Sequence, residues 1–497
     1  MNRDPRSRGW ITEDDRKDIQ GFVTSSFGHL PHNAYLFLRF GDPVQARRWL
    51  RDELGAVTFA ESWRKTKDQP KVKPPVTLNL AFTAVGLRAL GLDESCLQSF
   101  PPEFREGMPK RAKHLGDTGA SQPADWEFGA DVEAIHAMAI LSASTDHAIC
   151  REMADFLQRF TEMGGGTLVT EQRGFRSADA KEPFGFRDGI AQPSIRGIEE
   201  TGVRAGEFIL GHENEYGYHP VTPLVRDELD PRGILPGSPN PHHPGMRDLG
   251  RNGSYLVYRK LEQDVAGFWG FLRSESTRLK GRVDAPFIVW LAAKMMGRWP
   301  SGAPLTLSPE RDDPALRESD DFLYRSLDAE GTRCPFGAHI RRTNPRDQIR
   351  PTSTEESLHM TARHRILRRG SSYGRPLFDP TLLEIPESPG TGRLFETLKN
   401  DDERRGLHFL CINANIRTQF EFIQQTWMNN PTTNGLSNNP DPLSSCPMAA
   451  GRVRSMLIPG EARDLRTVSM PLFVTVRAGA YFFMPGRRAL SFLSGFP

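Results

Sequence analysis

One acidic residue stands between two glycines in a segment that is too short and too rich in glycine to be a helix. Asp188 lies in FGFRDGIAQP, with Gly185 and Gly189 on either side and Pro193 at the end. Glycine lets the backbone adopt positive φ angles and approach a ligand closely, and proline stiffens the chain after it. Taken alone, an Asp-Gly pair in such a stretch is most often a turn. The function of Asp188 therefore has to be judged together with the other motifs of the chain.

A single histidine follows two small residues in the motif CPFGAHIRRTNPR. Gly337 and Ala338 leave room beside the His339 imidazole for a large, flat group. Three arginines follow that could hold carboxylates: Arg341, Arg342 and Arg346. One neutral imidazole beside several cations is unsuited to a bare divalent cation, but it suits an axial ligand of haem iron whose propionates need partners. The other histidines show neither HExxH nor Cys/His zinc spacing.

Two further motifs come later in the chain. RHRILRRGSSYG contains Arg368 and Arg369 and has the pattern of a strand whose end aims one guanidinium at a site. GLHF has a strand pattern in which alternation puts Leu407 and Phe409 on one face and His408 on the other.

The composition is that of a globular protein with balanced charge. Of 497 residues, 25% are charged and 37% hydrophobic, and the mean hydropathy is −0.50. The 64 basic and 62 acidic residues leave a formal net charge of +2. This balance gives no support for nucleic acid or an anionic membrane as a partner. Five scattered cysteines without a CxxC pair argue against a disulfide framework and fit reduced thiols.

Neither a membrane span nor a signal peptide is visible in the pattern. The longest strongly apolar stretch, 285–296, is too short to cross a bilayer, which needs about 20 residues, and we expect it to be a core helix. The first residues contain arginines but no apolar segment of the kind that signal peptides have. We therefore expect a cytoplasmic protein without membrane partners.

The hydrophobic pattern divides the chain into two halves. Strand patterns run over 33–40, 76–82, 135–142, 254–261 and 406–412, and a hairpin pattern joins 472–476 to 481–484. Helical patterns follow at 44–54, 84–90, 146–160, 264–274 and 417–428. We expect a loosely held arm over 1–30, a first domain over 31–211, a crossover or surface loop over 212–252, and a second domain over 253–497. This organisation favours a duplicated α+β sandwich.

FGFRDG with IAQP, CPFGAHIRRTNPR, RHRILRRGSSYG and GLHF occur in this order, and together they resemble the signature of the dye-decolorizing (DyP-type) haem peroxidases. The resemblance runs from the first strand near residue 33 to the end, and the length is similar to the longer class of the family. It implies two ferredoxin-like domains, with haem b held mainly by the second. It also implies an enzyme that uses hydrogen peroxide to oxidise organic donors such as dyes and phenolics through a ferryl intermediate.

The resemblance implies roles for individual residues. His339 matches the proximal iron ligand, Asp188 the distal carboxylate that shuttles a proton, and Arg368 the distal arginine that stabilises charge. The choice of Arg368 over Arg369 rests on aligning ILRRG. Further residues expected to contact the haem are Gly185, Phe186, Gly189, Arg341, Leu407 and Phe409. Asp441, in NNPDP, is chosen by spacing as the carboxylate that orients His339.

Some features of the chain lie outside the shared motifs. His408 stands where the family often has an apolar residue, and alternation directs it away from the haem into the core or to the surface. Trp427 and Tyr373 are candidates for a surface aromatic that large donors would reduce, although most of the 8 Trp and 8 Tyr must be packing residues. Because an arginine lowers the pKa of a neighbouring carboxylate, we expect the best activity well below neutral pH.

Three other interpretations stay open at this stage. An unligated α+β protein with chance motifs is a fair default for any one motif, but a poor one for four in order. A haem-binding or haem-handling protein without efficient turnover would need His339, but neither Asp188 nor Arg368. A third is a non-catalytic cargo or scaffold role, such as packaging in a protein shell; RRALSFLSGFP ends in a short apolar tail, but nothing in it identifies a targeting tag. The sequence is compatible with a homo-oligomer.

Overall fold

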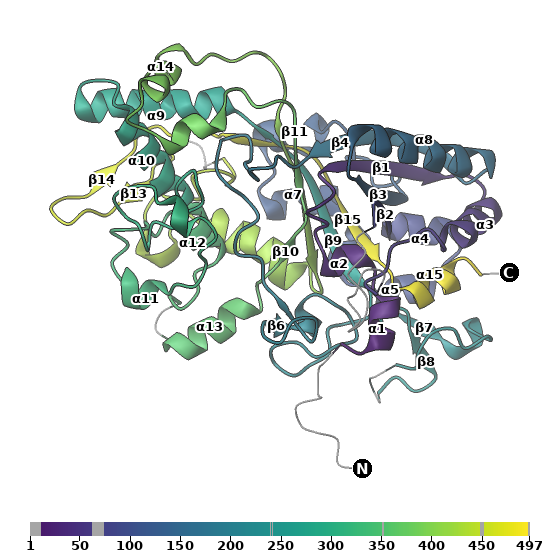
Figure 1. The fold of residues 1–497 in the computed structure, drawn as a ribbon. Helices are drawn as coiled ribbons and strands as arrows, with labels where there is room; N and C mark the ends of the chain where they lie inside the picture. The colour runs from purple at the N-terminus through teal and green to yellow at the C-terminus, as the bar shows by residue number, and fades with distance from the viewer. Residues whose placement is uncertain are drawn as a thin grey trace, which may run out of the picture.

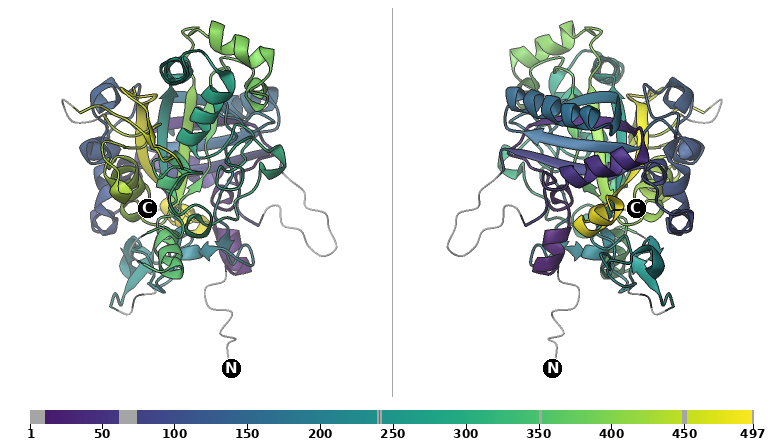
Figure 2. Two further views of the ribbon diagram at one scale, coloured as in Figure 1. Left: turned by 90° about the vertical axis from the view of Figure 1, so that its left-hand side faces the viewer. Right: turned by 90° about the vertical axis from the view of Figure 1, so that its right-hand side faces the viewer.

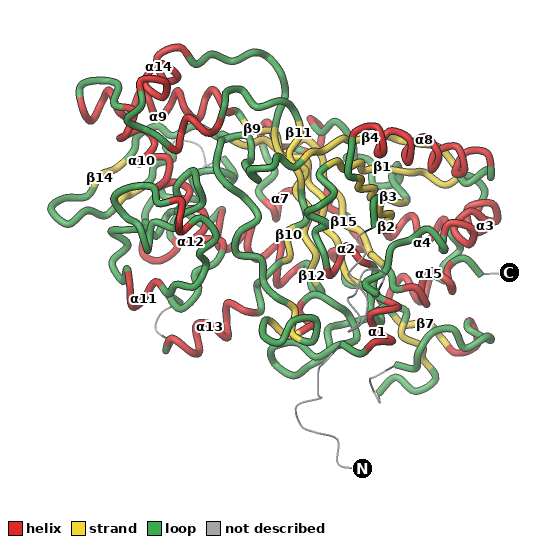
Figure 3. Tube along the Cα trace, viewed as in Figure 1, coloured by secondary structure: helices red, strands yellow, loops and turns green. Residues whose placement is uncertain are grey.

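The protein is described here by a computed structural model, which covers residues 11–61, 74–238, 240, 242–349, 352–447 and 452–495. Its central feature is an antiparallel sheet with strands from both halves of the chain (Figure 1, Figure 3). The first half supplies β1 (His32–Phe40), β2 (Val76–Phe82), β3 (Ala137–Ala143) and β4 (Gly166–Phe175). These strands lie in the order β4-β1-β3-β2.

The second half repeats this arrangement. Its strands are β9 (Ser254–Gln263), β10 (Leu367–Arg368), β11 (Ser371–Tyr373), β12 (Gly406–Asn413) and β15 (Val474–Met484). β10 and β11 both pair with β12 and together occupy one strand position, so the order is β15-β9-β12-β11. Numbered within each half, both sheets have the order 4-1-3-2.

Helices connect the strands of each half in the same places. The first half has α3 (Pro43–Glu53) after β1 and α8 (Asp146–Glu162) after β3, and the second has α9 (Val265–Lys280) after β9. Two π-helical turns, Arg417–Glu421 and Ile423–Met428, follow β12. Asp42 begins α3 by accepting hydrogen bonds from the backbone N–H groups of its first turn. The prediction of an α+β fold with two ferredoxin-like domains is confirmed.

The two sheets join edge to edge and close into one barrel. β2 pairs with β15 through Phe82 and Phe483, and β4 pairs with β11 through Phe175 and Ser372. The ring of pairings is therefore β4-β1-β3-β2-β15-β9-β12-β11 and back to β4. The duplicated α+β arrangement was expected, but its closure was not: pairing of the outer strands joins the two sheets at both edges.

The strands are apolar on both faces because both faces of the barrel wall are covered. On β1, Tyr35 and Phe37 belong to the interior cluster, whereas Leu36 and Leu38 pack outward beneath the helices. Trp49 of α3 packs in the same outer layer, fully buried. Each such side chain contributes roughly 1.5–3 kcal/mol when buried. Figure 2 shows α3 and α8 lying across the outside of the first-half strands.

Beside the barrel, the second half builds a helical layer with its own core. α9 packs against α10 (Ala285–Met296), which confirms the expected core helix, and Asp284 and Gly297 cap its two ends. Other short helices of this layer are α11 (Tyr324–Leu327), α12 (His339–Thr343), α13 (Thr354–Ala362) and α14 (Pro389–Thr397). Phe268, Trp269 and Ile288 form the centre of this second core. The layer occupies the left of Figure 1, next to β10.

Some expectations differ from the structure. The described part of 1–30 is not a loose arm: it forms α1 (Glu13–Asp18) and α2 (Gly21–Thr24), and the Ile19 and Phe22 side chains are buried. The hairpin expected near 472–484 is the single strand β15. The remaining elements are α4 (Ala84–Ala89), α5 (Glu94–Ser99), α6 (Pro102–Glu106), α7 (Met108–Leu115), β5 (Ile195–Arg196), β6 (Val203–Arg204), β7 (Leu224–Arg226), β8 (Met246–Asp248), β13 (Leu457–Ile458), β14 (Leu465–Arg466) and α15 (Arg487–Leu493).

Candidate active site

An ion pair joins the first motif to the third. Arg368, at the end of β10, donates from Nη1 to Asp188 Oδ1 at 2.7 Å and from Nη2 to the Ile190 carbonyl at 2.9 Å. Its backbone N–H donates to Gln192 Oε1 at 3.0 Å. The loop from Asp188 to Gln192 therefore fixes both the backbone and the guanidinium of Arg368.

The backbone of this loop explains its composition. Gly189 has φ +86°, and a Cβ added there would meet no atom within 4 Å, so Gly189 leaves space beside Asp188. Ala191 also has positive φ, +62°, and its carbonyl accepts a hydrogen bond from Arg365. Upstream, the Glu182 carboxylate accepts two backbone N–H groups of the turn before Asp188.

Strand register places Arg368 on the outer face of the barrel. Arg368 pairs with Cys411, and Leu367 with Ile412, which belongs to the interior cluster. Side chains directly opposite each other share a face, so Arg368 lies on the same face as Phe409, two residues before Cys411. Alternation gives Leu407 the same outer face. Both apolar residues expected over the distal haem side are therefore on the face that carries Arg368.

The fourth motif also positions His408 as alternation predicts. His408 is only 1% exposed and points into the barrel, where its ring packs against Tyr35 and Tyr258. Of the two environments expected for His408, core or surface, the structure shows the core.

A second pair joins the histidine motif to a distant aspartate. His339 is the first residue of α12, and its Nδ1–H donates to Asp441 Oδ2 at 2.9 Å. The other oxygen of Asp441 accepts the backbone N–H groups of Leu443 and Ser444 at 3.0 and 2.9 Å. Asp441 is fully buried. The partner chosen by spacing alone is thus the residue that contacts the imidazole.

The charges of the two pairs influence each other. Burial alone would raise the pKa of Asp188, but Arg368, the Gly189 N–H and His339 outweigh it and hold the pKa below the usual aspartate value. Burial alone would lower the pKa of His339, but the Asp441 carboxylate outweighs it and raises the pKa. Arg368 and Asp188 contribute to the His339 balance as well. The structure therefore brings His339, Asp188 and Arg368 together.

Solvent-accessible space reaches all three side chains, although they lie deep in the molecule. The accessible fractions are 46% for Asp188, 35% for Arg368 and 27% for His339. Donation from Nδ1 to Asp441 fixes the His339 tautomer and leaves the lone pair of Nε2 available. No described residue hydrogen-bonds His339 Nε2.

Three residues expected at the haem have other surroundings. Arg341 is fully buried, and each of its three guanidinium nitrogens donates to Asp328, Gln348 or the Cys334 carbonyl. Its position on α12, two residues after His339, turns it to the opposite side of the short helix. These contacts give Arg341 a structural role, and its contact with the cofactor stays a prediction.

The residues before Asp188 face the helical core rather than the accessible space. Phe186 is 2% exposed and stacks parallel to Trp269, with ring centroids 6.3 Å apart. A Cβ on Gly185 would meet Leu383 at 2.5 Å. Packing therefore explains Gly185 and Phe186, and of the expected glycines only Gly189 borders open space.

Two residues of the site were not singled out from the sequence. Gln192 belongs to IAQP and holds the backbone of Arg368. Arg365 is half-buried, and its pKa is lowered to about 10 by burial and by the neighbouring Arg346, so it remains a cation. The arginines of RHRILRR indicated that a cation lies near the site, but their spacing did not distinguish Arg365 from its neighbours.

The two aromatic residues considered as surface sites for donor oxidation differ in exposure. Trp427 is buried, whereas Tyr373 is half-buried.

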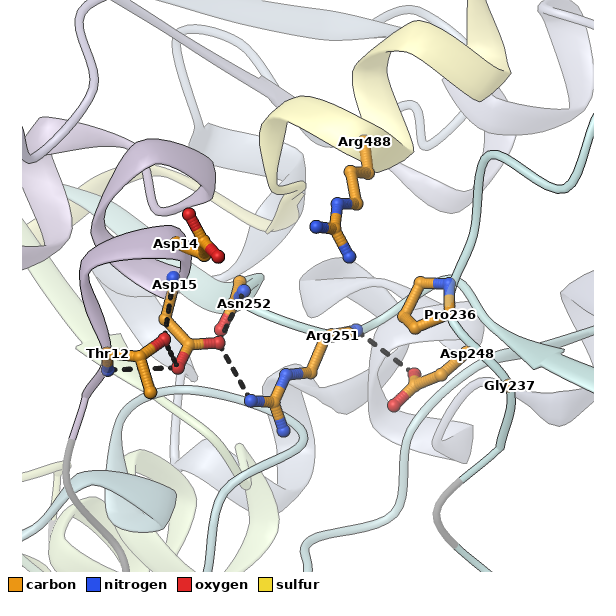
Figure 4. A pocket seen from close by; sticks show the side chains of 9 residues that line it. All are labelled: Thr12, Asp14, Asp15, Pro236, Gly237, Asp248, Arg251, Asn252 and Arg488. Atoms are coloured by element: carbon orange, nitrogen blue, oxygen red, sulfur yellow. Dashed lines mark hydrogen bonds and ion pairs between the residues drawn. The ribbon is translucent and has the colours of Figure 1, made fainter.

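Figure 4 shows a separate cavity of about 310 Å³ between α1, α15 and the loop around Arg251. Its lining residues are Thr12, Asp14, Asp15, Pro236, Gly237, Asp248, Arg251, Asn252 and Arg488. Arg251 is already paired with Asp15 at 2.7 Å. The cavity contains none of the motif residues, so it is not the candidate active site.

Within the described ranges, no group of three or more metal-ligating side chains is found, and no helix is long and apolar enough to span a membrane.

Known proteins are similar to this chain over most of its length. The family model described as the DyP dimeric alpha+beta barrel domain matches residues 18–171. A multifunctional dye peroxidase of Amycolatopsis sp. is 31% identical over 480 residues, which cover 92% of this chain and 91% of that protein. The chain belongs to the dye-decolorizing peroxidase family. A further dye-decolorizing peroxidase, from Auricularia auricula-judae, is 29% identical over 491 residues, covering 94% of this chain and 84% of the relative.

Solved structures of dye-decolorizing peroxidases have the same fold. The structure of an ancestral D-type dye decolorizing peroxidase superposes with a TM-score of 0.75 and 27% identity, covering 96% of this chain and 98% of that one. The A. auricula-judae peroxidase complexed with imidazole gives a TM-score of 0.73 at 27% identity, covering 97% and 99%. The chain is therefore a peroxidase of a haem-dependent family.

The residues present fit a haem. An imidazole with a free Nε2, held by a buried carboxylate through Nδ1, is the usual arrangement of a histidine that ligates a metal. The accessible Asp188–Arg368 pair places a carboxylate and a guanidinium within electrostatic reach of that imidazole.

Proposed function

We propose that this dye-decolorizing peroxidase binds haem b with His339 as the axial ligand and uses hydrogen peroxide to oxidise dyes and phenolics. The shared accessibility of His339, Asp188 and Arg368 carries the proposal, because each side chain would otherwise be buried in a protein core. The related enzymes are named dye-decolorizing and multifunctional dye peroxidases, which supports the class of donor.

His339 would bind iron through Nε2, and Asp441 would hold the ring in that orientation. When bound, haem would supply the iron that activates the peroxide O–O bond and would store the oxidising equivalents. Leu407 and Phe409 would pack against the haem on the side where Arg368 lies. Arg365, a half-buried cation with one hydrogen bond to the Ala191 carbonyl, is the better candidate than Arg341 for holding a haem carboxylate.

Asp188 would act as the acid–base group for peroxide. Its lowered pKa keeps it ionised at acidic pH, so Oδ1 or Oδ2 can accept a proton from one peroxide oxygen and deliver it to the leaving oxygen. Arg368 would stabilise the negative charge that develops on the departing oxygen. The hydrogen bonds of Arg368 to Ile190 and Gln192 would keep its guanidinium in place during this transfer.

Asp188→Asn tests this proposal in the haem-loaded protein. We expect unchanged haem binding but a slower reaction with hydrogen peroxide, by roughly 10²–10⁴-fold, the range for loss of a general acid–base group. Stopped-flow absorbance at the Soret band measures both properties. Glu318→Gln is the matched control, because Glu318 is an exposed carboxylate paired with Arg187 outside the site. Parent-like peroxide reactivity in Asp188→Asn would instead indicate haem binding without Asp188-dependent turnover.

Haem binding itself is tested separately. His339→Ala should lose the Soret band after haem loading, whereas the parent should keep it through gel filtration. Absence of a Soret band from the loaded parent protein would reject the proposal.

We further propose a cytoplasmic location, which is supported by five cysteines that form no disulfide.

A further inference from the structure

The barrel interior contains a histidine–tyrosine cluster that the proposed peroxide chemistry does not use. His408 is 1% exposed, and three tyrosine rings lie around its imidazole. Their centroid distances to it are 5.1 Å for Tyr35, 4.9 Å for Tyr373 and 6.0 Å for Tyr258. Tyr35 and Tyr258 are fully buried, and Tyr373 is half-buried. A histidine in such an apolar interior is costly unless its two nitrogens have specific partners.

The hydrogen bonds of His408 fix which nitrogen carries the proton. His408 Nε2 lies 3.0 Å from the Arg173 carbonyl oxygen, which can only accept, so Nε2 must carry the hydrogen. Burial lowers the pKa of His408 to about 3, so the imidazole is neutral and Nδ1 has a lone pair. The Tyr258 hydroxyl is 2.9 Å from Nδ1 and therefore donates to it. Tyr258 is thus a buried phenol whose proton already points at a base.

One strand separates this pair from the candidate active site. His408 lies between Leu407 and Phe409, which point to the opposite, outer face of β12. Arg368 is on that outer face, paired with Cys411. His408 and Cys411 are three residues apart, or about 10 Å along the strand at roughly 3.3 Å per residue. Electron transfer between the site and Tyr258 would therefore cross the thickness of a single strand.

We propose that Tyr258 and His408 form an internal radical site of this peroxidase. The inference rests on the proposed function, since peroxide-oxidised haem is the oxidant. Tyr258 gives one electron to that haem, and its phenolic proton moves to His408 Nδ1, leaving a neutral tyrosyl radical and an imidazolium. The imidazolium keeps its Nε2–H bond to the Arg173 carbonyl. One electron from a reducing donor, and return of the proton from Nδ1 to the phenolic oxygen, restore both residues.

The hydroxyl groups of two other buried tyrosines have different surroundings. Tyr255, on the same strand as Tyr258, is fully buried, and among the described residues its hydroxyl has no hydrogen-bond partner. Tyr481 donates to Glu421 at 2.9 Å, but both oxygens of that carboxylate already accept from Arg111 at 2.9 and 2.6 Å. The Glu421 carboxylate is therefore already committed to an ion pair with the Arg111 guanidinium. Of these tyrosines, only Tyr258 has a neutral base directed at its hydroxyl.

Electron paramagnetic resonance tests the assignment. Haem-loaded protein is mixed with one equivalent of hydrogen peroxide without donor and frozen within milliseconds. We expect a tyrosyl radical in the parent and in the matched control Tyr255→Phe, and loss of that signal in Tyr258→Phe. His408→Gln should lose it as well, because glutamine cannot take up the proton although Tyr258 is still present. A signal that survives in Tyr258→Phe, or that is unaffected in His408→Gln, would overturn the proposal.

The Soret band separates this inference from the proposed function. If peroxide changes the Soret band at the parent rate in every variant but no variant shows a tyrosyl radical, the radical site is wrong and the peroxidase proposal stands. If peroxide leaves the Soret band of the parent unchanged, both are wrong.

Nitrogen NMR of histidine-labelled protein without haem gives an independent check. The His408 resonances are assigned by their loss in His408→Gln, and we expect a proton on Nε2 and none on Nδ1. A proton on Nδ1 would reverse the hydrogen bond with Tyr258 and overturn the proposal.

Discussion

The adjacent residues Arg368 and Arg369 point to opposite faces of the sheet, because side chains alternate along a strand, and they therefore have different partners. Arg368 faces outward and pairs with Asp188 at 2.7 Å. Arg369 is 6% exposed and donates to the carbonyls of Phe22 and Val23. The sequence alignment favoured Arg368, and the structure adds the physical reason: only one of two consecutive residues can face the site.

Arg368 should set the acid limit of activity. Asp188 can act as a base only when ionised, so activity is present above its lowered pKa and is lost as the pH falls through that value. Arg368→Gln removes the cation that lowers the pKa, so the acid limb of the pH–rate profile should move to higher pH. The rate at the optimum should fall roughly 10²–10³-fold, as when an electrostatic stabiliser is removed.

Arg369→Gln serves as the contrast for this profile. It removes donors to buried carbonyls, so we expect lower thermal stability but an acid limb at the parent position. Peroxide-reaction rates recorded from acidic to neutral pH measure both variants. An Arg368→Gln profile with an unshifted acid limb would show that Arg368 does not control Asp188.

Asp441 should control haem retention through the orientation of His339. Asp441→Asn keeps an oxygen for the Leu443 and Ser444 N–H groups but replaces the carboxylate that accepts from His339 Nδ1. Loss of such an outer-shell partner commonly costs 10–100-fold in metal affinity or activity, and we expect a weakening of haem binding of about this size. Haem titration at the Soret band measures it, with His339→Ala as the lower limit. If Asp441→Asn binds haem as tightly as the parent, the His339–Asp441 hydrogen bond does not contribute to haem binding.

At the scale of elements, most of the buried, apolar strands could be predicted from the sequence, whereas the partly exposed β4 and the shortest strands were missed. β1, β2, β3, β9 and β12 are long, largely apolar runs that could be recognised. β10 and β11 contain only two and three residues, so their strand character comes from pairing with β12 rather than from their own pattern. The site residues came from motifs, whereas the Gln192 contact depends on a tertiary hydrogen bond that no local pattern encodes.

The wrong hairpin near the C-terminus has a specific cause. Arg477-Ala478-Gly479-Ala480 has the composition of a turn, yet it lies in the middle of β15. A Cβ on Gly479 would meet Met108 Sδ at 2.2 Å and Trp126 at 3.2 Å. The small residue therefore accommodates α7 against the strand, which is a packing requirement and not a turn.

Gly479→Val should consequently destabilise the protein although valine favours strands. Overpacking of this kind costs typically 1–3 kcal/mol, and Met108→Ala in the same chain should recover part of the loss. Urea unfolding followed by tryptophan fluorescence measures the change. Gly270→Ala is the matched control: Gly270 lies within α9, an added Cβ meets no atom within 4 Å, and we expect stabilisation of about 0.5–1 kcal/mol. Equal stability of Gly479→Val and the parent would reject the packing explanation.

At the scale of the whole molecule, the barrel depends on two seams that differ in composition. Each seam has one paired position: Phe82 with Phe483, and Phe175 with Ser372. Phe82 and Phe483 are fully buried, and Phe483 also contacts Phe100 at 5.4 Å between ring centroids. Phe175 is 46% exposed. The first seam is therefore closed by core packing and the second is not.

The second seam is held instead by a polar contact next to the site. Arg176, just after β4, donates from Nε to the Gly370 carbonyl at 3.0 Å and from Nη2 to the Arg369 carbonyl at 3.1 Å. These carbonyls belong to the short turn between β10, which carries Arg368, and β11. Opening of this seam would thus release the strand end that positions the distal arginine.

The two seams should respond differently to truncation of their phenylalanines. Phe483→Ala removes a fully buried aromatic ring and should cost about 3–5 kcal/mol, with faster hydrogen exchange in both β2 and β15. Phe175→Ala removes a half-exposed ring, so the free energy of unfolding should change by no more than about 0.5 kcal/mol. In the parent, amides of β11 should exchange before those of β15, because local opening is easiest where few apolar contacts must be broken. Hydrogen-exchange mass spectrometry resolves the two strands. Exchange of β15 before β11 would show that Arg176 closes its seam more firmly than aromatic packing closes the other.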